Sequence, residues 1–141
     1  MTTKRNRAGE TNFWSVARSW LHYELPMVRQ VSLKTIESYR LSLECYIDYL
    51  GTSCNVPKVA ICFDCFDQER IKGFMVWMRK IKDYAPKTRS TRLSAVKSFL
   101  AYAAEDDITL VALRESARVI KAPQVPKQPI EYLESVPMGT V

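Results

Sequence analysis

Histidine, glycine and cysteine are all scarce in this chain. Its 141 residues include one histidine, four glycines and four cysteines. The histidine, His22, has no serine, cysteine or carboxylate arranged with it in a recognisable catalytic pattern, so we expect it to have no catalytic role. The scarcity of glycine, with helix-forming residues dominating the interior of the sequence, favours an all-α fold.

The cysteines form no convincing metal or redox motif. Cys62 and Cys65 have C-x-x-C spacing, with Cys45 and Cys54 upstream. A zinc site usually needs a second, equally tight ligand pair, and a thioredoxin-like centre needs a βαβ context. We therefore expect no metal and no cofactor. An enzyme built on this cluster is an alternative that stoichiometric zinc in the purified protein would support.

Long apolar runs are also missing. No stretch approaches the roughly 20 residues of a membrane-spanning helix, and the N-terminus leads into no hydrophobic signal segment. We expect a cytoplasmic protein with reduced thiols, no membrane partner and no small-molecule substrate.

Basic charge and core-forming residues are plentiful. Apolar residues make up 47% of the sequence, enough for one ordinary domain, and the net charge is +6. Residues 67–104 hold nine basic and three acidic side chains, a local +6, whereas residues 105–141 hold four basic and six acidic ones. Such clustering points to a polyanionic partner, and a merely solvated basic face is the simpler alternative.

Helical periodicity predicts four or five helices at residues 11–120, between a flexible basic tail (1–10) and a proline-rich linker (121–141). The first helix begins near Asn12 and should end at Pro26. The second begins after the N-cap Ser32. Its expected apolar stripe is Ile36, Tyr39, Leu43, Tyr46, Ile47 and Leu50, with Gly51 left-handed at its C-terminal end.

After a predicted loop at residues 52–66, Asp67 should open the third helix and Pro86 should lie in the first turn of the fourth. A weaker fifth helix is expected over 109–120. The third helix should bury Ile71, Phe74, Met75, Met78 and Ile81. The fourth should bury Leu93, Val96, Phe99, Leu100 and Ala103. Trp14 and Trp77 fall at the sides of their helices, at the core edge or at a protein contact.

The second and fourth helices share a surface design. Small hydroxyl side chains and cations lie on an arc away from the core, so a helix backbone can approach a nucleic acid while hydroxyls and cations contact phosphates. On the fourth helix the arc holds Lys87, Thr91, Ser94, Ala95 and Ser98, with Lys97 at its edge. On the second it holds Lys34, Thr35, Ser38 and Ser42, with Glu37, Glu44 and Asp48 on another flank.

Two segments resemble the core-binding domain of tyrosine recombinases of the phage integrase type. Ser32, Thr35 and Tyr39 have its S-x-x-T-x-x-x-Y spacing. The stretch from Ala85 to Ala103 resembles its later helix, with a Pro-x-Thr start, an Arg-Leu pair and a Phe-x-x-Tyr-Ala finish. The resemblance covers roughly residues 11–135.

The resemblance implies a SAM-like bundle of crossed helical hairpins that clamps double-stranded DNA, with other recombinase protomers bound beside it. The second and fourth helices would face the major groove. It also implies these DNA-facing residues: Lys34, Thr35, Ser38, Arg40, Lys87, Thr88, Arg89, Thr91, Arg92, Ser94 and Lys97.

Two departures qualify that resemblance. Ala85 replaces a capping serine that is common in the family. The family's catalytic tyrosine, arginine pair, lysine and histidines belong to a following domain, and no His-x-x-Arg occurs here. We therefore expect a DNA-binding domain without catalytic residues. The alternative is a helical protein-interaction module that uses Trp14, Trp77 and apolar helix edges.

Overall fold

The computed structural model describes residues 12–123, which are helical and contain no strand. The all-α prediction is confirmed, and a fifth helix is present. The predicted tail at residues 1–10 and most of the predicted linker lie outside the described residues. The main elements are α1 (Phe13–Ser19), the π-helix η2 (Trp20–Val28), α2 (Leu33–Ser53), α3 (Gln68–Lys80), α4 (Pro86–Asp106) and α5 (Val111–Arg118).

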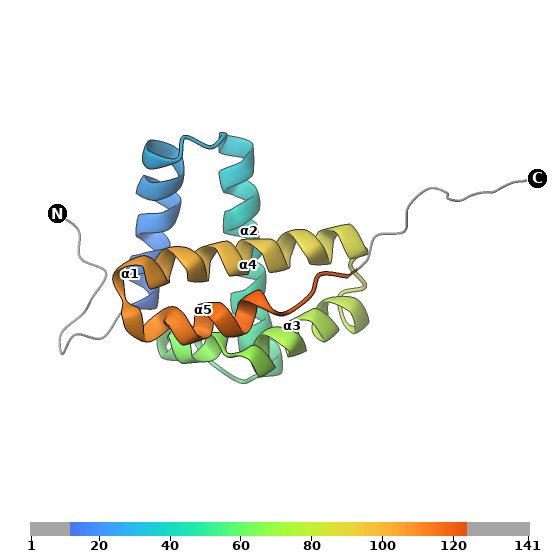
Figure 1. The fold of residues 1–141 in the computed structure, drawn as a ribbon. Helices are drawn as coiled ribbons and strands as arrows, with labels where there is room; N and C mark the ends of the chain where they lie inside the picture. The colour runs from blue at the N-terminus through green and yellow to red at the C-terminus, as the bar shows by residue number, and fades with distance from the viewer. Residues whose placement is uncertain (1–11, 124–141) are drawn as a thin grey trace, which may run out of the picture.

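Two helical hairpins cross one another (Figure 1). α1 and η2 run antiparallel to α2, and α4 lies across this pair. α3 and α5 pack against α4, on the side away from η2 and the N-terminal half of α2. The N-terminal half of α2 projects past α4 together with η2. This is the crossed-hairpin bundle expected from the sequence.

Aromatic side chains fill the core where the hairpins cross. The ring centroid of Phe99 lies 5.2 Å from that of Trp20, 5.6 Å from Phe13 and 5.8 Å from Phe63. Phe99 itself is completely buried. Such ring pairs add stabilisation beyond the area that they bury. The α4 side chain therefore links α1, η2 and the segment that precedes α3.

Pro26 does not end the first helix, contrary to the prediction. The chain continues through it as η2, with Leu25 fully buried beside it. A proline inside an α-helix clashes with the carbonyl one turn earlier and lacks a donor. The wider turn of a π-helix relieves that clash, which is why the helix continues to Val28.

The two ends of α2 show one confirmed and one wrong prediction. Ser32 is the N-cap, and its hydroxyl accepts a hydrogen bond from the backbone N–H of Thr35 at 3.2 Å. Gly51, however, lies inside the last turns of the helix. The left-handed residue is Asn55 (φ 59°), and the N–H of Val56 then bonds the carbonyl of Leu50 at 2.9 Å. Asparagine tolerates this conformation better than most side chains.

The connection from α2 to α3 is shorter and more ordered than the predicted loop at residues 52–66. Its first two residues belong to α2, and two 3-10 turns follow: η3 (Lys58–Ala60) and η4 (Phe63–Phe66). Phe63 and Phe66 are buried, so this connection contributes directly to the core.

α3 starts after Asp67, as predicted, but its apolar face is rotated. Trp77 is buried, and its ring centroid lies 5.6 Å from that of Tyr49 on α2. Ile81, which was expected in the core, is 70% exposed because it caps the helix end beyond the packed region. The other four predicted positions are buried or half-buried.

α4 is the central helix of the fold. The five apolar positions predicted for it are all buried. Ala95 is also buried, contrary to its predicted place on the open arc, because α3 and α5 pack beside the helix opposite α2. In contrast, none of residues 86–92 is buried. The first two turns of α4 therefore remain accessible to a partner.

Gly73 of α3 lies close to Tyr49 of α2, so the effect of Gly73→Ala on stability should depend on whether the Tyr49 hydroxyl is present. A Cβ added at Gly73 would lie 2.5 Å from the hydroxyl of Tyr49, which donates a 2.7 Å hydrogen bond to the carbonyl of Arg70. We expect Gly73→Ala to destabilise the domain by about 1–2 kcal/mol, the cost of breaking such a bond. In a Tyr49→Phe background the same change should stabilise it by up to about 1 kcal/mol through helix propensity. Urea unfolding of the four proteins measures both effects; equal changes in both backgrounds would contradict the prediction.

Candidate nucleic-acid interface

The crossing of α2 and α4 brings the two predicted polar arcs together. A guanidinium nitrogen of Arg92 lies 3.4 Å from the hydroxyl of Ser42. Ser42 is fully buried, contrary to its predicted place on the open arc, and its hydroxyl donates to the carbonyl of Ser38 at 2.9 Å. From this point the N-terminal half of α2 extends one way and that of α4 another (Figure 1). We call these two half-helices, residues 33–42 of α2 and 86–94 of α4, the α2–α4 corner.

Arg92 occupies the inside of the α2–α4 corner without a carboxylate partner among the described residues. Its Nε is buried and makes no hydrogen bond. Its guanidinium lies 5.7 Å from the centroid of the Tyr84 ring, which gives a cation–π contact. A half-buried cation that lacks a counter-ion is costly, so this arrangement favours an anion supplied from outside.

Tyr84 is a supporting residue that sequence reasoning missed. Its N–H bonds the carbonyl of Met78 at 2.9 Å after the left-handed residue Asp83 (φ 55°), and its carbonyl accepts from Arg89 at 2.6 Å. The turn thus fixes the ring beneath Arg92. No periodicity marks a turn residue, and only the preceding Asp and the following Ala-Pro hint at it.

Most of the other predicted DNA-facing residues lie on accessible parts of the α2–α4 corner. Half-buried positions are Ser38, Thr88 and Arg89, and exposed positions are Lys34, Thr35, Lys87, Thr91 and Ser94. Pro86 occupies the first helical position of α4, and Ala85 provides no side-chain cap. The first N–H groups of α4 therefore face outward from the same end as Lys87.

Arg40 and Lys97 are engaged within the domain. Arg40 pairs with Glu37 and Glu44 on its own helix, and these contacts raise the pKa of Arg40, the hydrogen bond to Glu37 most. The ammonium group of Lys97 bonds the carbonyls of Ile120 and, at 3.4 Å, Arg118 at the end of α5. Burial lowers the pKa of Lys97. Lys97 thus ties α5 to α4, and Arg40 offers little net charge.

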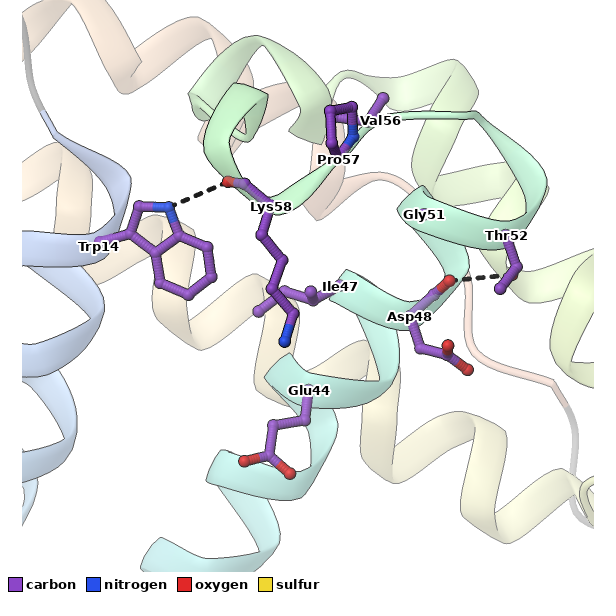
Figure 2. A pocket seen from close by; sticks show the side chains of 9 residues that line it. All are labelled: Trp14, Glu44, Ile47, Asp48, Gly51, Thr52, Val56, Pro57 and Lys58. Carbon is purple, nitrogen blue, oxygen red and sulfur yellow. Dashed lines mark hydrogen bonds between the residues drawn. The ribbon is translucent and has the colours of Figure 1, made fainter.

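Two acidic residues of α2, Glu44 and Asp48, lie on a different face of that helix, where they border a groove (Figure 2). Glu44 and Asp48 line this space of about 480 Å³ with Trp14 of α1 and the segment from Val56 to Lys58. The indole N–H of Trp14 donates to the carbonyl of Lys58 at 3.3 Å. Trp14 is 37% exposed. Two carboxylates make this groove unsuitable for a polyanion, so the charges of α2 are segregated by face.

Among the cysteines, Cys45 lies near the α2–α4 corner, close enough to Arg92 to feel its charge. Burial raises the pKa of Cys45, and the nearby Arg92 charge opposes that shift. Cys62 is exposed and Cys65 is buried in η4. No cluster of three or more metal-ligating side chains occurs among residues 12–123. In the same range no helix is both long and apolar enough to cross a membrane.

A comparison with known protein families identifies the family of this domain. Residues 18–106 match the family model described as phage integrase, N-terminal SAM-like domain. The chain belongs to this family. The match runs from the end of α1 to the end of α4, so it includes both halves of the α2–α4 corner. No curated protein and no solved structure matches the chain closely enough to count as a relative.

The family match agrees with the resemblance to tyrosine recombinases found in the sequence and with the all-α fold. The matched unit is the N-terminal domain of integrases, a non-catalytic part of those proteins. The segments that carried the resemblance in the sequence form α2 and the long α4 of this integrase domain.

Proposed function

We propose that this integrase domain binds double-stranded DNA as the core-binding domain of a site-specific tyrosine recombinase, and that the α2–α4 corner clamps one face of the recombination site. The observation that carries the proposal is the half-buried guanidinium of Arg92 at the crossing of the two helices, which forms no ion pair with the described part of the chain and whose Nε makes no hydrogen bond. A phosphate would supply the missing counter-ion. Other protomers bound to the same site are the expected protein partners.

The rest of the α2–α4 corner suits this partner. Lys34 and Lys87 are exposed cations on the two arms, and neither forms an ion pair with a described residue. The hydroxyls of Thr35 and Thr91 can donate to phosphate oxygens or base edges. Glu44 and Asp48 of α2 face the groove of Figure 2 instead, and Glu37 is paired with Arg40. Phosphate contacts fix the position of the duplex, and short side chains allow the helices to approach it.

The test is a fluorescence titration of mixed-sequence duplexes at several salt concentrations. We expect affinity to fall steeply with salt, and Lys34→Gln/Lys87→Gln to flatten the slope of log K against log salt by about 2, since each lost phosphate contact removes about 0.9. Arg18→Gln/Lys58→Gln removes the same amount of charge from exposed positions outside the α2–α4 corner. The proposal is wrong if the wild type does not bind, or if both double variants behave alike.

A further inference from the structure

A second group of cations surrounds a small hollow next to the α2–α4 corner. Arg79 at the end of α3, Arg89 near the start of α4 and Lys121 beyond α5 line a space of about 200 Å³. The other lining residues are Met75, Val76 and Pro123, so no carboxylate from residues 12–123 borders it. Three segments that are distant in the sequence meet here, at the end of the bundle where α4 begins (Figure 1).

The charges around this hollow are available to a ligand. The side chains of Arg79 and Lys121 are exposed and form no hydrogen bond or ion pair with residues 12–123. Arg89 uses one guanidinium nitrogen for the carbonyl of Tyr84, which leaves most of its five N–H donors free. Met75 is half-buried and Val76 is 48% exposed, so the floor is apolar. Cations over an apolar floor attract an anion more strongly than cations that are fully hydrated.

We propose that this hollow is a phosphate-binding site of the domain, occupied by a backbone phosphate of the same DNA duplex. The inference rests on the proposed function and extends it to α3 and to the segment after α5. Arg89 joins the two surfaces, because it belongs to the first turns of α4 and also lines the hollow. The volume suits a single phosphate group, and a planar guanidinium can bind it through two hydrogen bonds.

The experiment compares duplex binding by the wild type, by Arg79→Gln/Lys121→Gln and by the control Arg18→Gln/Lys58→Gln. Arg79 and Lys121 lie outside the α2–α4 corner, so they do not alter the surface that holds Arg92. We expect the hollow variant to bind about tenfold more weakly at low salt and to flatten the log–log salt slope by about 1. Methyl resonances of Met75 and Val76 should shift on addition of duplex to the wild type, and much less in the hollow variant.

The outcomes separate this inference from the proposed function. If the wild type binds and the hollow variant matches the charge control in affinity and slope, the hollow binds no DNA phosphate and only this inference fails. If Met75 and Val76 do not respond to duplex while resonances of the α2–α4 corner do, the inference is also overturned. If the wild type does not bind any duplex, both proposals fail together.

Discussion

Arg92→Met is expected to weaken duplex binding by roughly 10- to 100-fold without destabilising the domain. A hydrogen bond to a charged group contributes about 1.5–3 kcal/mol, which corresponds to that range. In the free domain the Arg92 Nε is buried without a partner, and no carboxylate neutralises the guanidinium among the described residues. Methionine keeps the apolar stem over Tyr84 and removes the unsatisfied group, so unfolding in urea should show equal or higher stability.

The two measurements together distinguish a DNA contact from a structural role. If Arg92 mainly holds α2 and α4 together through Ser42, the methionine variant will lose stability, and any loss of DNA binding will follow from that. Arg92→Lys keeps the charge but not the planar donor pair, and we expect it to bind with intermediate affinity. A stable methionine variant with wild-type affinity would exclude Arg92 from the interface.

Phe99→Ala should reduce the free energy of unfolding by about 3–5 kcal/mol, as expected for truncation of a fully buried phenylalanine. Phe99 is completely buried and contacts aromatic rings from α1, η2 and η4, including Phe66 at 6.0 Å. The cavity would open where the hairpins cross, and three elements cannot all shift to fill it. Because small domains are stable by about 5–15 kcal/mol, this variant should lose a large fraction of the stability of the domain.

Val59→Ala is the matched control for this loss, since Val59 is 93% exposed and its truncation should change stability by less than about 0.5 kcal/mol. Thermal and urea unfolding of both variants provide the comparison. A loss below about 1 kcal/mol for Phe99→Ala would mean that the crossing tolerates a cavity, and that the hairpins are held mainly by other contacts.

Prediction from the sequence was most successful where a pattern is local. The Ser32 cap and the apolar face of α4 follow from short-range rules on capping and helical spacing, and the structure confirms both. The predictions for Pro26, Gly51 and Ile81 were wrong. Pro26 lies in a π-helix, a helix type that spacing does not indicate. The end of α2 at Asn55 and the exposure of Ile81 depend on what packs beside the helix ends.

Among the candidate DNA-facing residues, too, local patterns were predicted better than contacts between helices. Helical spacing placed Glu44 and Asp48 away from the hydroxyl arc of α2, and both line a separate groove. The pairing of Arg40 with Glu37 and Glu44 is a local i,i+3 and i,i+4 pattern on one helix, which the sequence already contained. Spacing did not reveal that Lys97 is engaged, because its partners are carbonyls at the end of another helix. Nor did it indicate that Tyr84 supports Arg92, since a turn residue carries no periodic signal.

The sequence by itself determined the helical class, the family and the segments that carry basic charge, because helix propensity, apolar spacing and residue type are properties of short stretches of chain. Only the tertiary structure decided which cations are free. The crossing of α2 and α4 buries Ser42 and leaves Arg92 without a counter-ion among residues 12–123. The approach of α3, α4 and the segment after α5 places Arg79, Arg89 and Lys121 around one hollow. The surroundings of these four cations depend on neighbours that are distant in the sequence, and these neighbours are fixed only when the hairpins pack.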